Sequence, residues 1–128
     1  MELIQAAFTA FARADVAYIL DASDPHIEVV ESPDLLLDPS TYHGRQGLLA
    51  ALAHWSDEWE GLSVDVERIV GVGDRVVSLV LHRARGKSSG APVELHMAYV
   101  HTLKNRKVVR WEVFATWAQA LEAAGLTE

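Results

Sequence analysis

The spacing of apolar residues changes near Gly61, and this change restricts the possible folds more than any other feature of the chain. Before Gly61 the apolar residues recur every three or four positions, which is typical of amphipathic helices. Over residues 62–72 apolar and polar residues alternate, which is typical of a strand with one wet face. Helices that come first and antiparallel strands that come later predict an α+β domain, with the helices packed on the concave face of a strongly bent sheet.

The same patterns predict the individual elements. We expect a helix over residues 4–12, its continuation or a second short helix over 15–20, and a longer helix over 45–59. Strands are expected over residues 26–31, 62–72, 76–85, 93–104 and 107–114, with a hairpin turn at Asn105 and Arg106. A last short helix over residues 116–124 should end at Gly125.

Length and charge narrow the functional classes. The 128 residues fit a single domain over residues 1–128 with a substantial core. The formal net charge of −7 opposes binding to nucleic acid or to anionic lipid. No apolar run approaches the ~20 residues of a membrane helix, and no leader peptide is evident, so we expect a cytoplasmic protein with no membrane partner.

Cysteine and histidine usage argues against a metal or redox centre. The chain has no cysteine, which excludes disulfides, thiolate metal ligands and cysteine nucleophiles. Its six histidines are scattered, and His96 and His101, five positions apart, should face opposite sides of one strand. We therefore expect neither a metal nor a cofactor.

Several stretches of the chain, taken in order, point to a known family. They are YHGRQG at residues 42–47, GDRVV at 73–77, RGKSSG at 85–90, KVVRWE at 107–112 and ALEAAGL at 120–126. Together they resemble the SnoaL-like proteins, small relatives of ketosteroid isomerase, limonene epoxide hydrolase and nuclear transport factor two. The resemblance implies a cone-shaped half-barrel, whose mostly antiparallel sheet wraps around N-terminal helices and an apolar pocket. It implies no single activity, because this fold hosts isomerases, cyclases, hydrolases and proteins without chemistry.

The resemblance also implies which side chains face the pocket. On the last strand the inward residues would be Trp111, Val113 and Ala115, and the outward residues would be Arg110, Glu112 and Phe114. The strand over residues 93–104 has two open registers, of which we prefer the one with inward Met97, Tyr99, His101 and Leu103. The strand before it would then point inward with Val77, Leu79, Leu81, Arg83 and Arg85, which leaves His82 outside.

The catalytic acids of the relatives are not matched. Where ketosteroid isomerase has its general-base aspartate this chain has Ser32, and where the isomerase has an oxyanion-hole tyrosine it has Ala7. Limonene epoxide hydrolase has a carboxylate two residues after a last-strand tryptophan. Trp111 matches that tryptophan, but Val113 replaces the acid. A carboxylate of this strand would face the pocket only if a bulge turned Glu112 inward.

His101 is the strongest remaining candidate for proton transfer, because an unperturbed histidine titrates near ~6.5 and a modest shift moves it across neutral pH. Tyr99 would donate a hydrogen bond to a ligand oxygen. The alternatives are a histidine that only hydrogen-bonds and a tyrosine whose hydroxyl is satisfied locally. The candidate ligand-binding residues are Trp111, Val113, Arg83, Arg85, Met97, Trp55 and Ser32. For the two arginines the alternative is a solvated strand edge or an ion pair with Glu94 or Glu112.

These observations leave three hypotheses open. The first is an isomerase or cyclase that acts on a hydrophobic polycyclic, polyketide-like or terpenoid-like molecule by acid and base chemistry without a metal. The second is a non-catalytic protein that keeps the pocket to bind a ligand, and the third is a protein-interaction module that uses the outer sheet face. Because Ala98 and Val100 would make that outer face too apolar to stay wet, we also expect a homodimer through the sheet.

Overall fold

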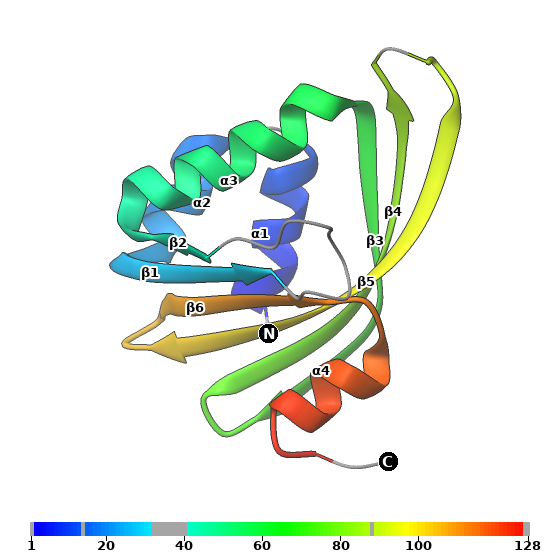
Figure 1. Cartoon of the computed structure of the whole chain (residues 1–128). Helices are drawn as coiled ribbons and strands as arrows, with labels where there is room; N and C mark the ends of the chain where they lie inside the picture. Colours follow the sequence, from blue (N-terminus) through cyan, green and yellow to red (C-terminus); the bar gives the residue numbers. More distant parts are fainter. Residues whose placement is uncertain (1, 14, 32–40, 88, 127–128) are drawn as a thin grey trace.

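The computed structural model describes residues 2–13, 15–31, 41–87 and 89–126, without the side chains of Glu2, Glu31 and residues 54–60. Four helices and six strands follow one another along the chain (Figure 1). Their bounds are α1 Glu2–Ala12, α2 Val16–Ala22, β1 Ser23–Glu31, β2 Thr41–His43, α3 Gly44–Glu58, β3 Trp59–Val72, β4 Arg75–Gly86, β5 Pro92–Lys104, β6 Lys107–Phe114 and α4 Trp117–Ala123. The expected order of elements is confirmed. Only β2, too short to show an alternating pattern, was not expected.

Caps define the two shortest helices. The Asp15 side chain accepts a hydrogen bond of 3.2 Å from the backbone N–H of Tyr18, so α2 begins as a separate helix and does not continue α1. Thr116 and Gln119 form a capping box at the start of α4. Gly125, at φ +81°, follows this helix in the left-handed region, as the sequence predicts.

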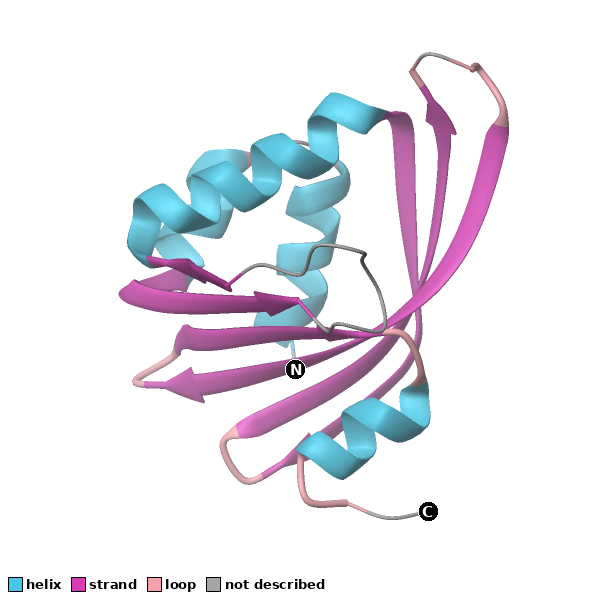
Figure 2. Ribbon diagram, viewed as in Figure 1, coloured by secondary structure: helices cyan, strands magenta, loops and turns pink. Residues whose placement is uncertain are grey.

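The six strands form one sheet in the order β2-β1-β6-β5-β4-β3, in which only the pair β1 and β6 is parallel. The sheet is strongly bent, and α1, α2 and α3 lie on its concave side (Figures 1 and 2). The main core cluster joins these helices to the inner sheet face, with Ile4, Phe8, Leu48 and Met97 among its buried members. The predicted α+β half-barrel is therefore confirmed.

The preferred register of β5 is correct. Met97, Tyr99 and His101 are buried, and the Phe8 ring of α1 lies against the last two, at 5.0 Å and 5.5 Å between ring centroids. Leu103 also packs against the main core cluster.

The expected register of β4 is wrong. Ser78 lies opposite Tyr99 and Val80 opposite Met97, and residues directly opposite each other share one face of a sheet. The inward series of β4 is therefore Val76, Ser78, Val80 and His82. The helix α4 covers part of the outer face, so both sides of this strand are apolar and alternation carries no signal for its register.

A bulge in β6 sets which side chains of that strand face inward. Leu103 pairs with Val108 and Thr102 pairs with Arg110, so Val109 is the extra residue. Asn105 and Arg106, at φ 53° and 63°, form the predicted hairpin turn. The bulge leaves Glu112 opposite Val100 on the outer face of the sheet. It therefore does not turn the Glu112 carboxylate towards the pocket.

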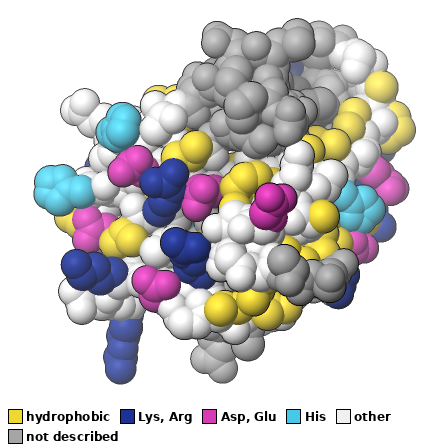
Figure 3. All heavy atoms as spheres, turned by 60° about the horizontal axis from the view of Figure 1, so that its bottom comes forward, with side chains coloured by type: hydrophobic (Ala, Val, Ile, Leu, Met, Phe, Trp, Pro, Cys, Tyr) yellow, Lys and Arg dark blue, Asp and Glu magenta, His cyan; other side chains and the backbone are white. Residues whose placement is uncertain are grey.

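The helix α4 covers an apolar part of the outer sheet face. Ala98 and Val100 are fully buried beneath Ala120 and Leu121 of this helix, so they do not supply the exposed apolar surface on which the expected homodimer was argued. Next to α4 the face is polar, and basic and acidic side chains alternate on it (Figure 3). Among the described residues, no helix is both long enough and apolar enough to cross a membrane.

Candidate functional site

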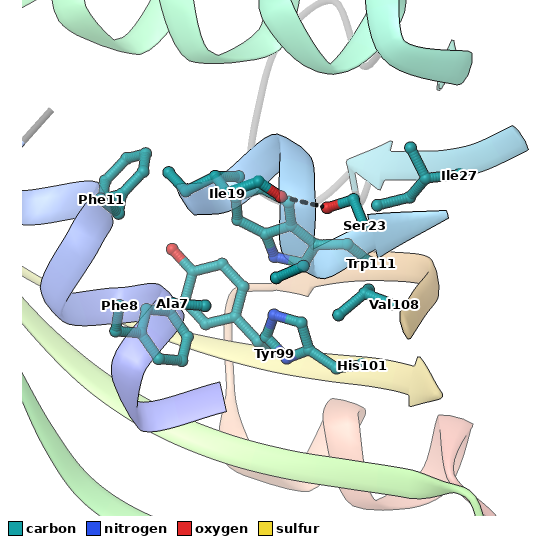
Figure 4. A pocket seen from close by; sticks show the side chains of 11 residues that line it. Ala7, Phe8, Phe11, Ile19, Ser23, Ile27, Tyr99, His101, Val108 and Trp111 are labelled. Atoms are coloured by element: carbon teal, nitrogen blue, oxygen red, sulfur yellow. Dashed lines mark hydrogen bonds between the residues drawn. The ribbon is translucent and has the colours of Figure 1, made fainter. Parts of the chain in front are cut away.

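On the concave side of the sheet, the main cavity of the described residues lies between α1, α2 and the strands β1, β5 and β6 (Figure 4). Its described lining residues are Ala7, Phe8, Phe11, Ile19, Ala22, Ser23, Ile27, Tyr99, His101, Val108 and Trp111. Ala7, which the resemblance aligns with the oxyanion-hole tyrosine of ketosteroid isomerase, thus lies in the wall. The cavity has a volume of about 30 Å³, which is room for about two water molecules. Its described lining is mostly apolar, and the polar side chains in it come from β1, β5 and β6.

His101 is a deeply buried polar residue of this wall. It is 4% exposed, and its ring stacks on the Trp111 ring, with 5.7 Å between centroids and 19° between planes. Its Nδ1 atom is buried and has no hydrogen-bond partner among the described residues. Burial lowers the pKa of His101 from 6.5 to about 3, so the imidazole is uncharged at neutral pH and is a weak base there.

Trp111 adds a second polar atom to the same wall. It lies directly opposite His101 on β6, and Figure 4 shows the two rings side by side in the cavity. The indole Nε1 atom is buried and, within the described part of the chain, has no acceptor. An indole nitrogen only donates, so this site lacks an acceptor.

The Tyr99 hydroxyl has a partner within the protein, which is the alternative left open for it. It points away from His101 (Figure 4) and forms a hydrogen bond of 2.8 Å with Nε2 of His82. Burial raises the pKa of Tyr99 and lowers the pKa of His82 from 6.5 to about 4, so both groups are neutral. His82 is the residue that sequence reasoning missed. The correct β4 parity, read from the pairing with β5, would have found it.

A second, smaller cavity of about 10 Å³ adjoins the main one. Its described lining residues are Phe11, Val29, Ala51, Leu52, Tyr99, Trp111 and Val113, so Val113 faces inward as expected. Phe11, Tyr99 and Trp111 line both cavities. The Phe11 and Trp111 rings meet edge to face, at 6.4 Å between centroids. These rings therefore form the partition between the two spaces.

The other candidate residues lie elsewhere. Arg83 points outward and pairs with Asp65 at 2.9 Å and with Glu94 at 3.4 Å, which is the alternative left open for it. Arg85 is exposed, and neither arginine lines the described cavities, which corrects the expected position at the pocket mouth. Met97 is fully buried in the main core cluster.

Two further candidate residues cannot be placed in the cavity, because they lie outside the part of the chain that the structure describes. The side chain of Trp55, on α3, and the whole of Ser32 lie outside the described residues. Within the described ranges, no three histidine, aspartate or glutamate side chains are grouped so that they could hold a metal ion.

Comparison with known protein families gives a match over most of the chain. The family model for the SnoaL-like domain matches residues 4–111. No curated protein matches the chain.

Solved structures share the fold at low sequence identity. An NTF2-like protein of unknown function from Burkholderia pseudomallei is similar with a TM-score of 0.79 and 20% identity, over 95% of this chain and 94% of that one. A putative SnoaL-like polyketide cyclase from Jannaschia sp. has a TM-score of 0.78 and 18% identity, over 88% and 82% of the two chains. A protein with a ketosteroid isomerase-like fold from Catenulispora acidiphila, in complex with trimethylamine, has a TM-score of 0.78 and 16% identity, over 98% and 93%. These identities show the fold alone.

Proposed function

The chain belongs to the SnoaL-like domain family, and from this premise we propose that it binds a small, largely apolar molecule in the main cavity. One observation carries the proposal: Nδ1 of His101 is buried in an apolar wall without a partner among the described residues. A buried polar atom without a partner destabilises a protein by about 1–3 kcal/mol. A ligand that hydrogen-bonds there recovers this free energy.

Ligand size is the main constraint on the proposal. A cavity of about 30 Å³ accepts only a small group, so a polycyclic ligand requires side chains to move. Phe11 is the side chain best placed for this, because it is half-buried on α1 and lines both cavities. Displacing its ring would join the two spaces.

A thermal-shift screen with a cavity-filling variant tests the proposal. The panel contains aromatic ketones, quinones, steroids, terpenoid epoxides and, because a similar structure holds it, trimethylamine. A ligand at ~100 times its dissociation constant adds roughly 2.7 kcal/mol, which raises the melting temperature by several degrees. Ala7→Leu should abolish the shift by filling the cavity, whereas Ala17→Leu on the exposed face of α2 should keep it. Shifts of equal size in both variants would place binding elsewhere, and no shift with any compound would refute the proposal.

Isomerase or cyclase activity is a second candidate, favoured by the hydrogen bond between Tyr99 and His82. In the tautomer in which Nε2 of His82 donates to the Tyr99 oxygen, the neutral phenol O–H is available to donate to a substrate oxygen on which negative charge develops. His101, with its low pKa, suits hydrogen bonding to the substrate better than proton abstraction. If a ligand from the screen is converted, Tyr99→Phe should reduce kcat. Unchanged kcat in that variant would exclude this role, and tight binding without turnover would support a non-catalytic binder.

The remaining sequence-based predictions also stay proposals. A homodimer would use the part of the outer face that α4 leaves open, and light scattering at high concentration tests it, since a strictly monomeric species would reject it. A protein-interaction module is the alternative that the screen would favour if no small molecule binds. The single-domain organisation and the cytoplasmic location are likewise predictions from sequence.

A further inference from the structure

We infer that the main cavity selects uncharged molecules that carry a hydrogen-bond acceptor, and that Trp111 recognises this acceptor. The inference rests on the proposed function, because it names the ligand class of the same cavity.

The described wall offers no charge to a ligand. Its 11 described residues are apolar or neutral, with tyrosine, histidine, tryptophan and serine as the only polar types. A carboxylate or ammonium group that enters such a site loses its hydration without gaining a counter-charge. The effective penalty in proteins is several kcal/mol per ion.

The two nitrogen atoms then define which uncharged molecules fit. Nε1 of Trp111 and Nδ1 of His101 are both buried without a partner among the described residues. They belong to stacked rings on directly paired positions of β5 and β6. The indole can only donate, so the complementary ligand atom is an acceptor, whereas His101 accepts or donates according to its tautomer.

The other polar groups of the wall are already engaged. The Ser23 hydroxyl donates to the Ile19 carbonyl oxygen at 2.7 Å (Figure 4), and the Tyr99 hydroxyl is bonded to His82. His101 would have to take up a proton before it could pair with an anion, and burial opposes that step by lowering its pKa to about 3. Recognition of an acceptor therefore falls to Trp111, joined by His101 itself in the tautomer whose Nδ1 carries the proton.

Four compounds of nearly the same planar shape test this inference on the wild-type protein. Acetophenone is uncharged and carries an acceptor, α-methylstyrene is uncharged without one, benzoate is the anion and benzamidinium is the cation. Each is titrated at pH 7 into protein labelled with nitrogen-15, while the indole N–H resonance of Trp111 is followed. The Trp111→Phe variant assigns that resonance and, because phenylalanine lacks the N–H group, also serves as the binding control.

We expect acetophenone to bind about tenfold or more tightly than either ion. It should move the Trp111 indole proton downfield, as a new hydrogen bond does, while α-methylstyrene binds more weakly and causes no such shift. Trp111→Phe should reduce the preference for acetophenone over α-methylstyrene. Benzoate or benzamidinium binding as tightly as acetophenone would overturn the inference and leave the proposed function standing. If none of the four compounds binds at millimolar concentration, the inference fails, whereas the proposed function is decided separately by the thermal-shift panel.

Discussion

Burial of His82 and His101 should make the protein lose stability in mild acid. Burial lowers the pKa of His101 from 6.5 to about 3 and that of His82 from 6.5 to about 4. In the unfolded chain both take up a proton near pH ~6.5. Between the folded and unfolded values the unfolded state binds more protons, so the free energy of unfolding falls as the pH is lowered from about 7 towards 4.

The size of the effect follows from these pKa values. Each proton taken up only by the unfolded state lowers the free energy of unfolding by about 1.4 kcal/mol for each pH unit below 6.5. At pH 5 the loss is about 2 kcal/mol for each histidine and about 4 kcal/mol for the two together. Domains are typically stable by only about 5–15 kcal/mol, so the loss is large enough to measure.

Urea unfolding at pH 7.5 and pH 5.0 measures this loss in the wild type and in two variants. The loss in His101→Gln should be smaller than that of the wild type by about 2 kcal/mol, because one of the two buried histidines is gone. His26→Gln, at an exposed histidine, should lose as much as the wild type. An equal loss in His101→Gln and wild type would refute the reasoning. An NMR titration of the wild type gives an independent check, since the His101 imidazole should stay neutral down to pH ~4.

Three further experiments test the bond between Tyr99 and His82, the burial of Met97 and the ion pairs of Arg83. Tyr99→Phe should lower the free energy of unfolding by about 1–2 kcal/mol, because it removes the hydrogen bond to His82. A double-mutant cycle with His82→Leu, measured by urea unfolding, should show a coupling free energy of about 1 kcal/mol. Additive effects of the two substitutions would show that the two side chains do not interact. Met97→Ala removes a fully buried core side chain and should destabilise by about 2–5 kcal/mol in the same assay, so a change below ~1 kcal/mol would contradict its placement. Arg83→Ala breaks only exposed ion pairs and should change stability by about 1 kcal/mol or less, with ligand affinity unchanged in calorimetry; a clear loss of affinity would return Arg83 to the binding site.

The sequence predicted correctly which residues of β5 face the candidate site, because the residue types of that strand indicate its register. On β5 the aromatic and histidine side chains of Tyr99 and His101 favoured one register, and the structure has that register. On β4 the same reasoning failed, because Val77 and Val80 are both fully buried, one beneath α4 and the other in the main core cluster. A strand covered on both faces has no polar side to indicate its orientation. For that reason the sequence did not identify His82 as a residue of the inner sheet face.

The sequence by itself determined the order of helices and strands, the hairpin at Asn105 and Arg106, and the family, because these depend on local spacing and on residue types at turns. The tertiary structure decided which polar groups meet. The bond between Tyr99 and His82 joins residues 17 positions apart, and the pairing of His101 with Trp111 depends on a strand register that includes the bulge at Val109. The low pKa values arise only when helices and sheet together remove these rings from water. Local sequence patterns do not determine these contacts, because a shift of the strand register by one residue moves every side chain of that strand to the opposite face of the sheet.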